Sequence, residues 1–494
     1  MLRRLPRRTI LLSNRYQSTT RDTVTIIPTV YELTQDKDLS PELNPENSLI
    51  SYLKSRNLIE SITDDNLYTK TKKDDIKHFK LYCGADPTAI SLHLGNLLPL
   101  MVLLHFQLNG ANIVGLIGGA TGKVGDPSGR KDERSEIEQN KLQNNIENIT
   151  CQFQTFFKNG IEYAKSRQFP IENHGNSQIL NNFSWWKDIK MLNFLAEFGK
   201  YIRISSMINR TSIQSRLQSK EGIGFNEFTY QILQAYDFYH LYKSENVNIQ
   251  VGGNDQWGNI TAGTDLIQKT LRKEAYGITV PLLLTLNGEK FGKSAGNAIF
   301  IDSKLTSPYQ MYQFFINVPD EMVGKLLKTF TLLPLNVIEG ELLPKHFQDS
   351  SLRIAQRVLA REVVDLIHGV GIGDEMAFIT GFLFPTPDQP YNDNLSAEKL
   401  IKNFKNSGIL YKYDLKNLEE KDIKLSNLIA EITGKSKSEI KRLIKAGGLY
   451  LGLNRDQFND PDDVVLFDKS IHLIDDKLML IRIGKHHYYV VEFV

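Results

Sequence analysis

Residues 79–119 read FKLYCGADPTAISLHLGNLLPLMVLLHFQLNGANIVGLIGG, and this stretch decides the fold class. A strand is expected over 79–83, where apolar residues precede a turn. The apolar pattern over 95–108 predicts a helix that stops at Asn109-Gly110, and a second, buried strand follows over 111–117. Strand, helix and strand at this spacing indicate a βαβ unit, and therefore an α/β protein with a parallel, doubly wound sheet.

Further elements follow this unit along the chain. A long helix is expected over 227–242, with a strand over 247–251 after it and another strand pattern over 279–286. The pattern from 307 to 384 is helical throughout. A proline-rich run at 385–390 then indicates a linker, beyond which the chain ends in a small α+β module.

The first 21 residues differ in composition from the rest. They contain six arginines and several serines and threonines, and no acidic residue occurs before Asp22. This composition is typical of a mitochondrial transit peptide, which predicts a protein of the mitochondrial matrix. A basic tail that binds RNA is the alternative. Without these arginines the formal net charge falls from +2 to −4, so a nucleic-acid site would have to be a local basic patch.

The bulk composition excludes several classes of protein. The longest central apolar run, 97–104, is far shorter than the roughly 20 residues that a membrane helix needs. The two cysteines, Cys83 and Cys151, form neither a CxxC pair nor a zinc spacing, so neither a disulfide framework nor a metal site is expected. The glycine-rich run after 117 is not a P-loop, because Ile117 and Val124 stand where glycine and Ser/Thr are required.

A first candidate site surrounds the turn after the first strand. A helix that begins just after His93 directs its free N–H groups towards the sheet's carboxyl edge, where an anion can bind. Thr88 and His93 can both donate to an oxyanion there, and Gly95 lets a flat base approach the backbone. Taken alone, however, a histidine before a helix is usually only a cap or a surface residue.

A second candidate is the polar run KFGKS at 290–294. Lys290 and Lys293 flank Gly292, which makes a mobile cationic loop that could close over a triphosphate. A solvated surface loop is the alternative.

A third candidate is a polar helix face. Tyr230, Gln234 and Asp237 stand at positions i, i+4 and i+7, so they share one side of a helix whose other residues are largely apolar. Such a stripe either lines a pocket or faces solvent.

Together these motifs resemble the class I tyrosyl-tRNA synthetases of the bacterial and organellar type. The matching text, over roughly residues 50–494, is LYCGADPTAISLHLGN, GLIGGATGKVGDPSGR, NNFSWW, FNEFTYQILQAYDF, QVGGNDQWGNI and KFGKS. Asn96 departs from the family, which commonly has a histidine there; HxGN is more usual in tryptophanyl-tRNA synthetases, the alternative enzyme. Tyr82 and the polar helix face favour tyrosine.

The resemblance implies that the chain joins L-tyrosine to tRNA(Tyr) in two steps, using ATP with Mg²⁺ and no tightly bound cofactor or metal. The catalytic residues would be Thr88, His93, Lys290 and Lys293. Tyrosine would bind at Tyr82, Asp126, Asn182, Tyr230, Gln234, Asp237 and Gln256. ATP would bind at Gly84, Asp86, Thr88, His93, Gly95, Asn96, Asp255, Lys290, Lys293 and Ser294.

It also implies a domain order and partners. The expected segments are a transit peptide (1–21), an extension (22–50), a Rossmann-like catalytic domain (51–306), an all-α anticodon-side domain (307–384), a linker region (385–424) and an α+β RNA-binding domain similar to ribosomal protein S4 (425–494). A short helical pattern is expected over 49–62, where the extension meets the catalytic domain. A homodimer is expected, with Phe225 and residues 192–201, including Phe194, Leu195 and Phe198, as interface candidates. Ordinary core is the alternative for these residues.

The last segment contains a capping box at Ser436–Glu439, which opens a short basic helix. Its expected tRNA contacts are Lys437, Lys441, Arg442 and Lys445; a solvated face is the alternative. A structural RNA-binding protein on a synthetase fold, such as a partner in intron splicing, is a second hypothesis. Such a protein need not keep His93 or the loop lysines, so an enzyme is favoured.

Overall fold

A computed structural model describes the chain from residue 47 onward. It leaves out Asp74, 129–136, Pro170, Glu172, 219–221, Lys290, 295–296, 385–395, 415–423, Asn454, 463–471 and 485–486, and it gives only the backbone of Thr211, Ser212, Lys293, Ser294 and Asn297. The expected transit peptide, most of the extension and the proline-rich run therefore lie outside the described residues.

The first sheet has six strands in the order β1-β6-β5-β2-β3-β4. They are β1 (Ser61–Ile62), β2 (Lys80–Ala85), β3 (Asn112–Ile117), β4 (Ser177–Asn181), β5 (Ile249–Gly253) and β6 (Tyr276–Val280). Neighbours are parallel except at the edge, where β1 pairs antiparallel with β6. The strand order reverses between β2 and β5, which opens a crevice at the carboxyl ends of these strands.

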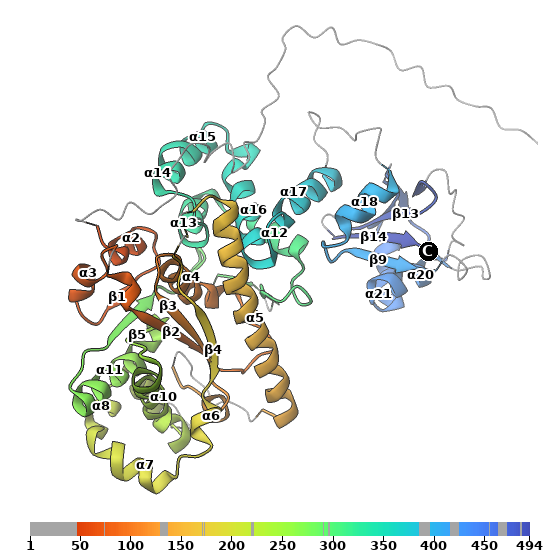
Figure 1. Cartoon of the computed structure of the whole chain (residues 1–494). Helices are drawn as coiled ribbons and strands as arrows, with labels where there is room; N and C mark the ends of the chain where they lie inside the picture. Colours follow the sequence, from red (N-terminus) through yellow and green to blue (C-terminus); the bar gives the residue numbers. More distant parts are fainter. Residues whose placement is uncertain are drawn as a thin grey trace, which may run out of the picture.

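Helices cover both faces of this sheet (Figure 1). Helices α4 (Leu94–Leu108) and α5 (Gln139–Ser166) pack on one face, and α10 (Phe225–Glu245) and α11 (Trp257–Leu271) pack on the other. Alternate residues of β2 serve the two faces: Leu81 and Cys83 join the first core, and Tyr82 joins the second. The expected doubly wound α/β sheet is confirmed.

Two sequence-based boundaries were wrong. The helical pattern over 49–62 divides into α2 (Leu49–Ser55) and the edge strand β1. Asn57 has a φ of 60° just beyond α2, and the Arg56 guanidinium is held by distant backbone carbonyls, so tertiary contacts end the helix early. Similarly, β6 ends at Val280 rather than continuing to 286, because Pro281 cannot donate a ladder hydrogen bond.

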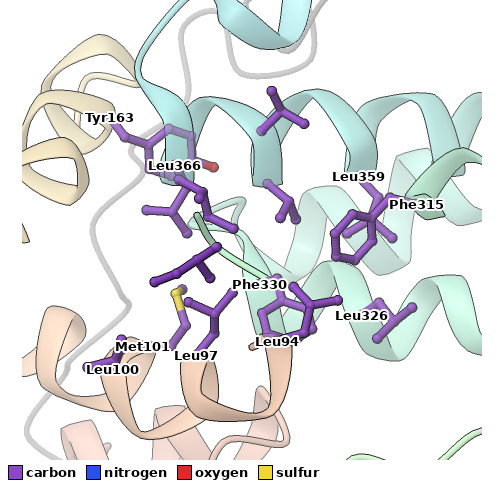
Figure 2. Close-up of a cluster of buried hydrophobic side chains, with 14 of the residues drawn as sticks. Leu94, Leu97, Leu100, Met101, Tyr163, Phe315, Leu326, Phe330, Leu359 and Leu366 are labelled. Atoms are coloured by element: carbon purple, nitrogen blue, oxygen red, sulfur yellow. The ribbon is translucent and has the colours of Figure 1, made fainter. Parts of the chain in front are cut away.

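The region 307–384 is helical, as expected. Its helices are α12 (Pro308–Ile316), α13 (Asp320–Phe330), α14 (Leu335–Val337), a π-helical turn (Ile338–Leu342), α15 (Leu343–Gln348), α16 (Ile354–His368) and α17 (Ile372–Leu383). Figure 2 shows how Leu97 and Met101 of α4 share an apolar core with Phe330 and Leu359 of this region. The sheet and the helical region are therefore packed against one another.

The C-terminal sheet is mostly antiparallel, in the order β11-β10-β13-β14-β9, with β12 beside β13. Its elements are α18 (Ala397–Phe404), β9 (Leu410–Tyr413), α20 (Leu425–Thr433), α21 (Lys437–Lys445), β10 (Leu449–Leu451), β11 (Asp456–Phe458), β12 (Leu473–Ile474), β13 (Leu478–Ile483) and β14 (His487–Phe493). Because β9 pairs with β14, the sheet starts before residue 425. The module contacts α17: Tyr488 and Arg455 both donate to the carbonyl of Leu383. None of the described helices is long and apolar enough to cross a membrane.

Candidate active site

Asp86 joins three segments at the carboxyl edge of the sheet. It follows β2, and its Oδ1 accepts a hydrogen bond from Thr121 Oγ1 at 2.8 Å. Its Oδ2 accepts from the Tyr230 hydroxyl of α10, also at 2.8 Å. A Cβ added at Gly118 would lie 1.9 Å from Asp86 Oδ1, so a larger residue there would displace this carboxylate. The turn after β2, the loop after β3 and the polar face of α10 therefore meet at one carboxylate.

Asp237 forms the buried floor of the site. Its Oδ1 accepts hydrogen bonds from the indole N–H groups of Trp185, at 2.9 Å, and Trp186, at 2.7 Å. Its Oδ2 accepts from Asn182 Nδ2 at 2.9 Å. Burial raises the pKa of Asp237 to about 7, although these three donors oppose the shift. With 2% of Asp237 and 6% of Tyr230 exposed, the alternative that this helix face points to solvent is wrong.

Tyr82 adds an unsatisfied hydroxyl to the same region. The residue is 1% exposed, and its oxygen has no hydrogen-bond partner among the described residues. Burial, and secondly the charge of Asp237, raise the pKa of Tyr82 well above its usual value, so the hydroxyl stays protonated. A buried hydroxyl beside a carboxylate is suited to bind a ligand that carries a hydroxyl of its own.

A second polar network lies nearer the surface. Gln256 Nε2 donates to Asp126 Oδ2 at 2.7 Å. Asn259 Nδ2 of α11 lies 3.1 Å from the amide oxygens of both Gln256 and Gln234. These residues come from the loop after β3, from α10 and from the start of α11, and together they offer one carboxylate and several amides to a charged amino acid.

His93 is the N-cap of α4, as the simpler interpretation held. Its Nδ1 accepts from the backbone N–H of Gly95 at 3.0 Å, and Asn96 Oδ1 accepts from the backbone N–H of His93. Since Nδ1 is an acceptor, the neutral ring carries its proton on Nε2, which is the atom that would donate to a phosphate. Capping and phosphate binding are therefore compatible.

The KFGKS loop lies beside this cap. The backbone N–H of Leu94 donates to the carbonyl of Ile299, and the N–H of Ile299 donates to the carbonyl of Gly292. Within the loop, the short strand β7 (Lys293–Ser294) pairs with β8 (Asn297–Ala298). The structure thus brings the two expected phosphate-binding segments together, although it does not describe the lysine side chains.

Comparisons with known proteins agree with this arrangement. A family model described as tRNA synthetases class I (W and Y) matches residues 74–380. The mitochondrial tyrosine–tRNA ligase of Saccharomyces cerevisiae is 48% identical over 452 residues, which cover 90% of this chain and 89% of that relative. The mitochondrial ligase of Drosophila melanogaster is 37% identical over 84% of this chain and 87% of its own.

The chain belongs to the class I tyrosyl-tRNA synthetases. A solved structure of a C-terminally truncated mitochondrial tyrosyl-tRNA synthetase from Aspergillus nidulans resembles it with a TM-score of 0.62 at 33% identity, and covers 68% of this chain and 94% of that one. The family expected from the motifs is confirmed.

Several partners in this synthetase's site were not predicted individually. Thr121, Trp185, Trp186 and Asn259 all lie within motifs that the sequence resemblance used, but nothing local indicated which carboxylate or amide each would contact. Asp255 is exposed, and the backbone N–H of Thr88 donates to the carbonyl of Asp86. No group of three or more His, Cys, Asp or Glu side chains in the described part of the chain is arranged to hold a metal ion.

Proposed function

We propose that this synthetase is the tyrosine–tRNA ligase of mitochondria, and that it activates tyrosine with MgATP before transferring it to tRNA(Tyr). The observation that carries the proposal is the buried pair of Tyr82 and Asp237. One is a donor with no partner among the described residues, and the other is a carboxylate already held by three donors. A phenol bound at this pair would accept from the first and donate to the second.

The rest of tyrosine extends from this pair towards the surface. Its ammonium group would lie among Tyr230, Gln234 and Asp126, where acceptors and a negative charge are available. Gln256 would bind the carboxylate, and it already bonds to Asp126. Asn182 fixes the floor: it is fully buried and bonds to both Asp237 and Thr121.

ATP would occupy the crevice between the cap of α4 and the KFGKS loop. The tyrosine carboxylate attacks the α-phosphorus, an oxygen–phosphorus bond forms, and pyrophosphate leaves with the electron pair of the broken bond. Thr88, His93, Lys290 and Lys293 would stabilise the charge on the phosphates. Gly84, Asp86, Gly95, Asn96, Asp255 and Ser294 would line the nucleotide. Mg²⁺ would arrive bound to ATP.

The second step would use RNA-binding surfaces outside the catalytic domain. The helical region is proposed to contact the anticodon side of the tRNA, and the C-terminal, S4-like module to contact its phosphates. Exposed Lys437, Arg442 and Lys445 of α21 support the latter. Lys441 is half-buried and paired with Asp462, so it is less available.

A homodimer is also proposed. Leu192 is 79% exposed, Leu195 47% and Phe225 71%, which supports an apolar interface at these residues. Phe194 and Phe198 instead belong to the buried core, as the alternative held. Sedimentation of the wild type and of Phe225→Ser tests this: a wild-type monomer would contradict the proposal.

ATP–pyrophosphate exchange with tyrosine, phenylalanine and tryptophan tests the activity itself. Tyrosine alone should support exchange, because a site that bonds a hydroxyl rejects the analogue lacking it by about 10⁴–10⁵-fold; the measured example behind that range is itself a tyrosine enzyme. Exchange with tryptophan instead of tyrosine would favour a tryptophanyl-tRNA synthetase, the alternative that Asn96 suggested. Import of a tagged full-length chain into isolated mitochondria, with shortening of its N-terminus, tests the location.

A further inference from the structure

One face of α5 carries three amide side chains at intervals of seven residues: Asn145, Gln152 and Asn159. Seven residues are nearly two helical turns, so the three side chains point to the same side. Asn145 Nδ2 donates to the carbonyl of Pro87 at 2.9 Å, and Asn159 Nδ2 donates to the carbonyl of Ile367 at 2.8 Å. The first bond reaches the turn after β2, and the last reaches α16 of the helical region.

Gln152, in the middle, holds the segment that leads into His93. Its Oε1 accepts from the backbone N–H of Leu92 at 2.9 Å and lies 3.2 Å from Ser91 Oγ. Ser91 Oγ in turn accepts from the backbone N–H of Asp302, just beyond the KFGKS loop. The amide oxygen of Gln152 therefore holds residues 91–92, which lead into the cap of α4. Through Ser91 it also holds Asp302, where the chain continues after the KFGKS loop.

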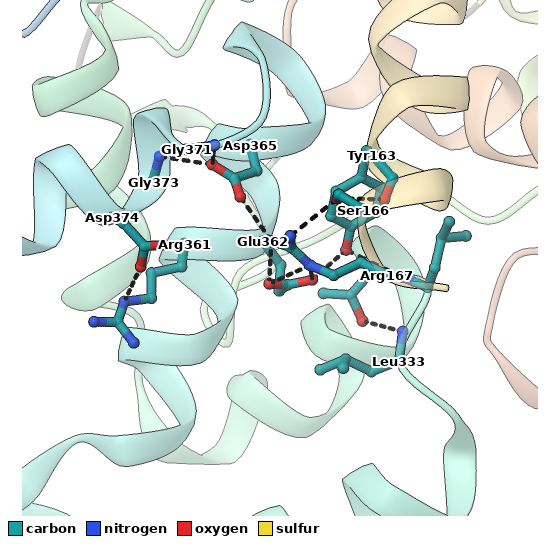
Figure 3. Close-up of polar contacts among 12 residues, drawn as sticks. Tyr163, Ser166, Arg167, Leu333, Arg361, Glu362, Asp365, Gly371, Gly373 and Asp374 are labelled. Carbon is teal, nitrogen blue, oxygen red and sulfur yellow. Dashed lines mark hydrogen bonds and ion pairs between the residues drawn. The ribbon is translucent and has the colours of Figure 1, made fainter. Parts of the chain in front are cut away.

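The C-terminal end of α5 is anchored to α16 by a buried polar cluster (Figure 3). Arg167 Nη2 lies 2.9 Å from Glu362 Oε1 and 2.6 Å from Asp365 Oδ2. The Tyr163 hydroxyl donates to Glu362, whose side chain is fully buried. Breaking a buried pair of this kind is costly, so α5 is held firmly at this end.

We propose that Gln152 and Asn145 are positioning residues for adenylate formation. They hold the 86–93 loop, which carries Thr88 and His93, at a place set by α5. The anchored end of α5 makes it a rigid support, and a misplacement of about 1 Å in a phosphate-binding group lowers the rate by as much as about 10²-fold. The inference rests on the proposed function, since it assumes that this loop binds ATP.

The decisive variant is Gln152→Met, which keeps the length of the side chain and loses the acceptor. Single-turnover adenylate formation should slow by about 10-fold or more, while the Kd for tyrosine stays unchanged, because the side-chain hydrogen bonds of Gln152 to described residues all go to residues 90–92. Gln152→Glu keeps an oxygen acceptor for Leu92 and should restore most of the rate. Gln143→Met is the matched control: Gln143 lies on the exposed side of α5 and bonds only to Glu147 among the described residues.

The outcomes separate the two proposals. If the wild type and Gln143→Met do not activate tyrosine, the proposed function fails. If they do and Gln152→Met matches them, the inference fails. Equal losses in rate and in tyrosine affinity, with Gln152→Glu no better, would show a purely structural role. Should Gln152→Met not fold, as judged from its thermal unfolding, Asn145→Ala tests the same claim at the carbonyl of Pro87.

Discussion

Gly292 of the KFGKS loop lies directly against Leu94 at the start of α4: a Cβ built on Gly292 would be 3.2 Å from the Cβ of Leu94. Gly292 also has a φ of 77°, in the left-handed region that glycine adopts most easily. This contact places the backbone of the lysine loop beside the cap formed by His93. Under the proposed function, this arrangement would put the loop and the cap on two sides of the same phosphates.

Lys293→Ala should lower the rate constant of adenylate formation far more than the affinity for tyrosine. A loop that grips the phosphates mainly in the transition state contributes to kcat, and the loss of one such group costs on the order of 10²-fold. Stopped-flow measurement with saturating ATP checks this. Lys304→Ala, which removes an exposed lysine shortly after the loop, is the control and should behave as wild type. A Lys293→Ala defect confined to tyrosine binding would contradict the role.

Tyr82→Phe should have opposite effects on stability and activity. In the free protein the Tyr82 hydroxyl is buried without a described partner, which costs about 1–3 kcal/mol, so its removal should raise the free energy of unfolding by about 1 kcal/mol. Tyrosine activation should nevertheless fall by roughly 10-fold, because the phenol loses one partner.

Urea unfolding and pyrophosphate exchange measure the two effects of Tyr82→Phe. Tyr163→Phe is the contrast for stability, because it removes an equally buried hydroxyl that does have a partner, Glu362, and it should destabilise the protein. A destabilised Tyr82→Phe would mean that the hydroxyl is already satisfied in the free enzyme.

The sequence predicted the parts of the fold that local patterns determine. The βαβ unit followed from periodicity, and Tyr230 and Asp237 were placed on one face by helical spacing alone. Contacts between distant segments were not predictable: the end of α2 depends on carbonyls more than 270 residues beyond Arg56, and Trp186 reaches Asp237 across 51 residues. The end of β6 just before Pro281 did have a local signal, because the proline marks it. The apolar pattern over 279–286 was given more weight, so the strand was predicted to continue past it.

Tyrosine binding should strengthen as the pH rises through about 7. Burial raises the pKa of Asp237 to about 7, so the folded protein without ligand favours the protonated carboxyl. The protonated Asp237 therefore contributes to folding stability below the ordinary pKa of an aspartate, and this contribution is lost as the pH rises through about 7. In the proposed site the phenol of tyrosine donates to Asp237, and the ionised carboxylate is the stronger acceptor, so tyrosine binding should follow the opposite trend.

Trp186→Phe should move this midpoint upward by roughly one pH unit, because the carboxylate loses one of its three donors. Phenylalanine keeps an aromatic ring against Phe194 and Tyr236, which limits the structural damage. Calorimetric titration of tyrosine from about pH 5.5 to about pH 8.5 gives the midpoint, a range chosen around the ionisation of a perturbed carboxyl. Trp257→Phe, at a more exposed indole with no recorded bond to Asp237, serves as the control. An unchanged midpoint in Trp186→Phe would rule out this account of Asp237.

The basic helix α21 is best tested by changing charges rather than by deleting the module. Removing residues from 425 onward would take β14 away from β9 and uncover Phe404, which packs in the same core as Tyr488 of β14. Neutralising Lys437, Arg442 and Lys445 to glutamine changes only exposed side chains, and no ion pair is recorded for them within the described residues.

The triple variant should bind tRNA more weakly, with the slope of log K against log salt shallower by about two, as expected for the loss of three phosphate contacts. Pyrophosphate exchange should be unchanged, because every residue assigned to tyrosine or ATP lies between Tyr82 and Ser294. The control neutralises Lys399, Lys402 and Lys405, three exposed lysines of α18 and its C-cap, and so makes the same change in net charge. Filter binding at several salt concentrations, together with aminoacylation, measures the effect. If both triple variants lose affinity equally, the contribution is general electrostatics; if neither does, α21 does not contact the tRNA.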